Sequence, residues 1–267
     1  CIMVGMPLQS MILHHQIIRA GIRLDVAIGT TLINMYGKLG HIQEASKVFY
    51  TMKDMNEVTW GSMVASYVEN GFCLPALKTF IKMQDEGIKP EKACFLYIFK
   101  ACGQLGALES SLIHGQIIEI GLMMDVEIVS ALIHMYVKCG SLSDAYKILN
   151  SFPNGNIVSW GTMIVGFAQH GLSFSALHLY ENMVEQGIKA SDIILPCILK
   201  ACGSKRNAHR GKQIHNDILR KGLLKKDMVL GTALVDMYVK CGILSKARKV
   251  LEELPVRNVI SWSALIA

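Results

Sequence analysis

Apolar side chains recur along this chain at helical spacing, in short stripes that end at glycine. In residues 57–91 the first stripe comprises Val58, Met63, Val64, Tyr67 and Val68 and stops near Asn70-Gly71. A second stripe comprises Ala76, Leu77, Phe80, Ile81 and Met83 and closes at Gly87, with Pro90 beyond it. Spacings of three and four residues are typical of amphipathic helices, and Asn and Gly are common at helix C-termini. The pattern therefore predicts two helices joined by a tight turn.

The same pattern returns about every hundred residues. Asp25-Val26 recurs as Asp125-Val126 and Asp227-Met228, and the Trp60 position recurs as Trp160 and Trp262, at intervals of 100 and then 102 residues. Self-similarity at a fixed period is the signature of a repeat array. A single globular domain of this length is possible, but a linear array explains the periodicity better.

Each period divides into three helical hairpins of different length. One type covers 57–91 and 157–191, with a partial copy at 259–267; a second covers 92–125 and 192–227, with a partial copy at 1–25; the shortest covers 26–56, 126–156 and 228–258. One hairpin cannot bury its own apolar stripe, whereas stacked hairpins can. The expected fold is all-α, a right-handed α-solenoid of stacked helix-turn-helix repeats in one continuous array over residues 1–267.

Composition and motif spacing narrow the chemistry. Hydrophobic residues make up 51% of the chain and charged residues 18%, so nearly every segment must bury a face. None of the eight cysteines forms a C-x-x-C pair, so zinc and dithiol redox sites fail on spacing, and no metal site or cofactor is expected. His14, His114 and His215 share one register without partners at metal-site spacing and are expected to be surface or turn residues. The net charge of +6 is compatible with a polyanionic partner.

Catalytic and membrane-spanning roles find no support in the sequence. There is no deaminase H-x-E with C-x-x-C, no G-x-x-x-x-G-K-[ST], no G-x-S-x-G and no H-E-x-x-H, so this stretch is not expected to be an enzyme. The charge-free run 157–180 is long enough to span a bilayer, but it copies the charged run 58–80, so no membrane partner is expected. No transit peptide is visible, and the array starts and stops mid-repeat, as expected for a fragment of a longer protein.

Several phrases of the sequence resemble pentatricopeptide repeats. They are Trp160-Gly-Thr-Met-Ile with Gly187-Ile-Lys, Ala201-Cys202-Gly203 with Gly211-Lys-Gln-Ile-His215, and the run from Ala233 to Gly242. The order of unit lengths resembles the plant PLS subclass, in which 57–91 would be a P unit, 92–125 an L unit and 126–156 an S unit. Tetratricopeptide repeats are the nearest rival, but their fixed length does not produce this rhythm.

The resemblance implies a sequence-specific single-stranded RNA-binding module that reads one nucleotide per repeat. It further implies that the module positions a mitochondrial or chloroplast transcript for processing, with C-to-U editing performed by a domain or partner absent from this chain. Editing-complex proteins are implied as further partners, and no DNA is expected.

In the family, the fifth and last residues of each unit read the base together. Carried over, the S units give small hydroxyls with Asn, a combination that implies adenine: Thr30 with Asn56, Ser130 with Asn156, and Thr232 with Asn258. The P and L units depart from the pattern and are expected to be weakly selective or silent: Gly61 with Glu91, Gly161 with Ser191, Leu96 with Asp125, and Pro196 with Asp227. The implied target carries adenine at every third nucleotide.

Two further sets of residues are implied to contact RNA. The second residue of each unit packs against base faces in this family, a role that fits Ala27, Val58, Ala93, Val158, Ile193, Val229 and Ile260 but not Glu127. Lysines recur before the turn of each S unit and are candidates for phosphate contact or for solvated surface: Lys38, Lys138 and Lys240.

Three alternatives stay open at this point. A hydroxyl early in a helix and an Asn at a unit boundary can serve as helix caps rather than base readers. The array can instead be a protein-binding scaffold of the tetratricopeptide-like kind. It can also be a degenerate array that binds nothing well.

Overall fold

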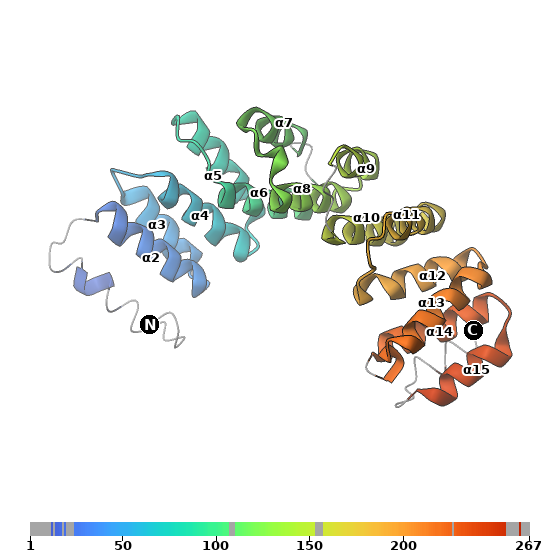
Figure 1. The fold of residues 1–267 in the computed structure, drawn as a ribbon. Helices are drawn as coiled ribbons and strands as arrows, with labels where there is room; N and C mark the ends of the chain where they lie inside the picture. The colour runs from blue at the N-terminus through green and yellow to red at the C-terminus, as the bar shows by residue number, and fades with distance from the viewer. Residues whose placement is uncertain are drawn as a thin grey trace. The chain divides into compact units, whose positions relative to one another are not determined.

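The computed structural model describes residues 12, 14–17, 19, 24–106, 110–152, 157–225, 227–254 and 262. All regular secondary structure in these residues is helical, which confirms the all-α class (Figure 1). The chain forms two compact units, Cys1–Cys139 and Gly140–Ala267.

The first unit is built from helical hairpins stacked side by side. Its helices are α2 (Val26–Lys38), α3 (Ile42–Thr51), α4 (Glu57–Glu69), α5 (Cys73–Asp85), α6 (Lys92–Leu105), α7 (Ser110–Ile120) and α8 (Val126–Lys138), with a 3₁₀ turn η2 (Leu122–Met124) before α8. The first helices of successive hairpins pack in the order α2, α4, α6 and α8, while α3 and α5 pack against their hairpin partners and the next first helix (Figure 1). One layer of first helices therefore runs through this unit.

The second unit repeats this arrangement. Its helices are α9 (Leu142–Ser151), α10 (Ile157–Gln169), α11 (Ser173–Glu185), α12 (Leu195–Ser204), α13 (Ala208–Arg220), α14 (Met228–Lys240) and α15 (Leu244–Glu253), with 3₁₀ turns η3 (Asp192–Ile194) and η4 (Leu223–Lys225). Here α10, α12 and α14 form the layer of first helices.

Proline sets where α12 begins. Its counterpart α6 is continuous from Lys92, whereas the stretch from Asp192 starts as a 3₁₀ turn and becomes α-helical only at Leu195. Pro196 lies in the first turn of α12, where the missing N–H costs nothing. A helix starting at Asp192 would place the same proline after a full turn, where a helix needs that N–H.

Aromatic residues of adjacent hairpins meet in a core that is otherwise mostly aliphatic. Trp60 is 1% exposed and its ring meets Phe49 edge-on at 4.9 Å between centroids. Trp160 is also buried. Trp262, at the corresponding position of the last copy, is 49% exposed. The helix α4, which carries Trp60, is followed by α5, whereas the described residues include no helix after Trp262.

The long apolar run 157–180 is interrupted by a turn. It is divided between α10 and α11, and Gly171 between them takes a positive φ of 76°. Across the described residues, no helix has both the length and the apolar character needed to cross a membrane.

Three histidines join the L-unit hairpins to the S-unit hairpins that follow them. The Nδ1 atoms of His14, His114 and His215 lie 2.8, 3.1 and 2.9 Å from the hydroxyls of Tyr36, Tyr136 and Tyr238. Each pair of rings also meets edge-on, at 5.5, 5.7 and 5.5 Å between centroids. The expectation of surface or turn residues is therefore wrong, because the histidines are half-buried and hydrogen-bonded across the interface between hairpins.

These pairs make the fold sensitive to acid. Burial lowers the pKa of His14 and of His215 below the ordinary value of 6.5. The Nε2 atom of His215 is also buried without a hydrogen-bond partner among the described residues, which adds to the cost of a charged ring. A neutral histidine is therefore part of the folded state.

The free energy of unfolding is expected to fall as the pH drops. The unfolded chain binds protons from about pH 6.5 downward, whereas the folded histidines resist protonation until a lower pH, so stability is full above pH 6.5 and declines below it. Urea unfolding at pH 7.5 and pH 5.5 measures the difference. A His215→Gln variant should lose part of this pH dependence; an unchanged dependence would show that other groups cause it.

Candidate nucleic-acid interface

Aliphatic side chains at the second residue of the first helices lie exposed. Val58, Val158 and Val229 are 46%, 58% and 66% exposed. Ile193, which lies in the 3₁₀ turn η3, is 82% exposed. Ala27, Ala93 and Glu127 are exposed as well. Exposed apolar residues that recur at one helix position mark a binding surface better than scattered ones do. Contact of these residues with bases stays a prediction, and Ile260 lies outside the described residues.

Thr30 and Asn56 are joined through a third residue, Thr59. The hydroxyl of Thr30 lies 2.8 Å from the hydroxyl of Thr59. Both the backbone N–H and the hydroxyl of Thr59 donate to Oδ1 of Asn56, each at 3.0 Å. Asn56 is also the N-cap of α4, so capping and a base-reading position coincide in one side chain. Sequence reasoning missed Thr59, although a hydroxyl follows each of the three S-unit asparagines at this spacing, as Thr59, Ser159 and Ser261.

The hydrogen bonds fix the polarity of this pair. Because Oδ1 of Asn56 accepts two hydrogen bonds, its amide NH₂ is the end left for a ligand. Because Thr59 gives its single hydroxyl proton to Asn56, Thr30 must donate to Thr59 and keep only lone pairs to offer. The pair therefore presents an acceptor at Thr30 and a donor at Asn56.

The other two S units are described only in part. The Ser130 hydroxyl donates to the carbonyl of Val126 at 2.6 Å, and the Thr232 hydroxyl donates to the carbonyl of Met228 at 3.0 Å. In each case the hydroxyl proton goes to a carbonyl of the residue's own helix. Their predicted partners Asn156 and Asn258 lie outside the described residues.

A groove opens beside Gly61. Its volume is about 210 Å³, and it is lined among others by Gly61, Glu91, Val58, Ala93 and Tyr97. The structure thus brings the two predicted base-facing residues of this P unit together between two exposed second-position residues. A Cβ built on Gly61 would meet nothing within 4 Å, whereas one on Gly161 would lie 3.3 Å from Ile194 Cγ2. The space beside Gly61 is therefore open, whereas Ile194 occupies the corresponding space beside Gly161.

The remaining P- and L-unit positions are less open. Leu96, Pro196 and Ser191 are half-buried, and Asp125 and Asp227 are N-caps. Asp125 Oδ1 accepts from the backbone N–H groups of Glu127 and Ile128, at 3.0 and 3.1 Å. Asp227 Oδ1 accepts from those of Val229 and Leu230, at 2.8 and 3.2 Å. These carboxylates hold the starts of α8 and α14, and their effect on bases stays a prediction.

The three recurring lysines are exposed at the ends of their helices. Lys240 pairs with Asp236 at 2.7 Å. The stem of Lys138 lies beside Gly103, where a built Cβ would come within 3.2 Å of it, and Lys240 lies equally close to Gly203. Phosphate contact stays a prediction for Lys38, Lys138 and Lys240.

Comparison with known proteins establishes the family. A family model of the PPR repeat matches residues 30–57, 58–88, 127–156, 158–188 and 232–259, which together make up more than half of the chain. The chain belongs to the pentatricopeptide repeat family. None of the matched stretches reaches into residues 92–125 or 192–227.

Pentatricopeptide repeat proteins of Arabidopsis thaliana align with nearly the whole chain. The chloroplastic protein At4g18520 is 34% identical over 95% of this chain and 41% of its own length. The mitochondrial protein At3g09040 is 33% identical over 97% of this chain and 25% of its own length. The chain therefore spans well under half the length of these curated relatives.

A solved member of the family shares the fold. The crystal structure of the pentatricopeptide repeat protein PPR10 in complex with an 18-nt psaJ RNA element has a TM-score of 0.75 to this chain, at 18% identity, and covers 96% of this chain and 39% of its own. The expected helical-repeat architecture is thus confirmed. The described residues contain no cluster of three or more His, Cys, Asp or Glu side chains able to hold a metal ion.

Proposed function

We propose that this chain is a single-stranded RNA-binding module that reads one nucleotide per repeat, with adenine favoured at the three S units. It positions a mitochondrial or chloroplast transcript for processing, and C-to-U editing by a separate domain or partner is the processing step we favour. The observation that carries the proposal is the hydrogen-bonded series Thr30, Thr59 and Asn56, because it leaves an acceptor and a donor that suit one order of groups on a base edge.

The polarity of Thr30 and Asn56 suits adenine. The Watson–Crick edge of adenine offers an amino donor beside the N1 acceptor, which matches an acceptor at Thr30 and a donor at Asn56. Guanine and uracil present the opposite order, with a carbonyl acceptor beside a ring N–H donor. Cytosine has the same order as adenine but a smaller ring, and the family resemblance favours adenine between the two.

Other features support RNA over other ligands. The solved relative PPR10 was crystallised with an RNA element, and relatives of this chain are named as chloroplastic or mitochondrial. Exposed aliphatic residues on successive first helices supply apolar surface for stacked bases. The net charge of +6 favours a polyanion.

A binding titration tests the proposal. The ligand is a short RNA with adenine at every third position, and the controls replace those adenines with cytosine, uracil or guanine. We expect the adenine RNA to bind more tightly than the guanine and uracil RNAs, by about tenfold per mismatched base, and to weaken steeply as salt rises because phosphate contacts release counterions. Equal affinity for all four RNAs would contradict base reading.

One observation favours a second function, binding to a polypeptide. Large apolar side chains lie exposed on second helices and beside them: Leu112 and Phe174 are each 70% exposed, and Met124 is 73% exposed. If a sample with a helical circular dichroism spectrum fails to bind RNA at low salt, the protein scaffold becomes the better explanation.

A further inference from the structure

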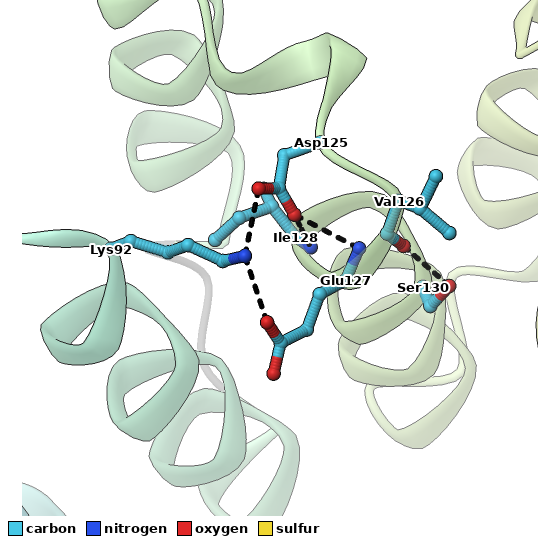
Figure 2. A network of polar contacts seen from close by, with 6 residues as sticks. All are labelled: Lys92, Asp125, Val126, Glu127, Ile128 and Ser130. Atoms are coloured by element: carbon cyan, nitrogen blue, oxygen red, sulfur yellow. Dashed lines mark hydrogen bonds and ion pairs between the residues drawn. The ribbon is translucent and has the colours of Figure 1, made fainter.

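Lys92 joins two carboxylates at the boundary between an L hairpin and the S hairpin that follows. Lys92 begins α6, while Asp125 and Glu127 lie at the start of α8, packed beside it. The Lys92 ammonium lies 2.7 Å from Asp125 Oδ2 and 2.8 Å from Glu127 Oε2. Figure 2 shows the ammonium between the two carboxylates, with the other Asp125 oxygen directed at the backbone of α8.

Both oxygens of Asp125 are therefore occupied. Oδ1 caps α8 through the N–H groups of Glu127 and Ile128, and Oδ2 accepts from Lys92. The hydrogen bond from Lys92 is the first cause that lowers the pKa of Asp125, followed by the bond from Ile128 N–H. The carboxylate stays ionised, but its charge is matched by an ammonium rather than offered to a ligand.

We propose that Lys92 masks Asp125 and thereby makes the L unit 92–125 indifferent to the base it meets. A capping carboxylate with one free oxygen is acceptor-only and selects a ring N–H, as in guanine or uracil. With Lys92 in place, that oxygen already accepts from an ammonium group. A guanine or uracil ring N–H therefore gains no hydrogen bond there. The inference rests on the proposed RNA binding and names a specificity-determining residue within it.

The other complete L unit lacks this lysine. The residue that corresponds to Lys92 is Asp192, and it pairs with Lys221 at 3.3 Å instead. Both L units keep the aspartate cap, at Asp125 and at Asp227. The mask is thus a property of one unit, and the nucleotide opposite 192–227 provides an internal control.

Lys92 is expected to contribute little to the stability of the fold. Its side chain is 39% exposed and that of Glu127 is 65% exposed, and exposed ion pairs contribute little to stability. Asp125 also keeps its two backbone hydrogen bonds without the lysine. Removing the ammonium should therefore change selectivity without unfolding the chain.

The test uses Lys92→Met in the 267-residue chain. RNAs keep adenine at every third position, and each intervening nucleotide is varied through all four bases. The unchanged protein should show no preference at the nucleotide opposite 92–125, whereas the variant should gain about tenfold for guanine and uracil there. Preference at the nucleotide opposite 192–227 should not move.

A double variant and a titration of Asp125 separate the mask from other roles of the lysine. Lys92→Met combined with Asp125→Asn keeps a capping side chain but removes the acceptor, so the new preference should disappear. NMR titration should show that the pKa of Asp125 rises in Lys92→Met, with or without RNA. Uniform weakening for all four bases would overturn the inference and assign Lys92 to phosphate, and unchanged selectivity would overturn it too. If the unchanged protein binds none of the RNAs, the proposed function itself fails, and this inference fails with it.

Discussion

Replacing Asn56 with aspartate is expected to move the base preference of the S unit 26–56 from adenine toward guanine. Oδ1 of Asn56 accepts from Thr59, and aspartate can accept the same two hydrogen bonds. What changes is the outward atom, from an NH₂ donor to an oxygen that only accepts. Adenine N1 then loses its donor and faces a negative charge, while the N–H groups of guanine gain an acceptor.

The expected size is about tenfold in each direction, since one well-placed polar contact to a base edge discriminates by about 1–3 kcal/mol. Fluorescence anisotropy with RNAs that differ only at the nucleotide opposite 26–56 measures it. The fold should survive, because aspartate caps helices as well as asparagine does and its charge suits a helix N-terminus.

Asn56→Ala is the matched control. It removes both the cap and the outward donor, so it should cost about 1 kcal/mol of stability and flatten the preference rather than reverse it. If Asn56→Asp, which keeps the cap, retained the adenine preference of the unchanged protein, the cap alone would account for Asn56 and the base-reading role would be refuted.

The helices could be predicted because the pattern that specifies them is local. The stripe from Val58 to Val68 and the glycine at 71 specify α4 and its turn without reference to the rest of the chain. The start of α12 could not be predicted in this way. Its position in the repeat matches that of α6, and the repeat pattern alone does not indicate that Pro196 moves the start of the α-helix to Leu195.

The individual residues of the candidate site could be proposed from the sequence, but the hydrogen bonds between them could not. Thr30 and Asn56 came from the resemblance, whereas Thr59, which links them, lies next to Trp60 on the buried stripe and is itself fully buried. Lys92 meets partners more than thirty residues away, and a lysine at a helix start gives no sign of them.

The histidine–tyrosine pairs could have been predicted from the sequence by a pattern other than metal-ligand spacing. Each histidine precedes its tyrosine by 22 or 23 residues in all three copies, and this second recurrence is what predicts contact between hairpins. Two residue types that recur together in a repeat array are candidates for an interface between units, even where neither forms a motif alone.

Gly37→Val is expected to destabilise the first unit by about 1–3 kcal/mol, because it overfills a close contact between α2 and α4. A Cβ built on Gly37 would lie 2.7 Å from Ser66 Cβ and 3.4 Å from Ser66 Cα. The carbonyl of Gly37 also accepts from the Asn70 side chain at 2.9 Å, a bond that breaks if the helices separate. Urea unfolding followed by circular dichroism measures the loss.

The chain itself suggests the compensating change. One period later the same two positions are Val137 and Gly166, so a larger first residue accompanies a smaller second one. Gly37→Val combined with Ser66→Gly should therefore recover part of the lost stability. Gly61→Val in α4 is the matched control, because a Cβ there meets no atom within 4 Å and valine forms helix better than glycine does. Equal losses of stability in Gly37→Val and Gly61→Val would mean that a β-branched residue, rather than the contact with Ser66, destabilises the helix. If the double variant recovered no stability, positions 37 and 66 would not share one packing space.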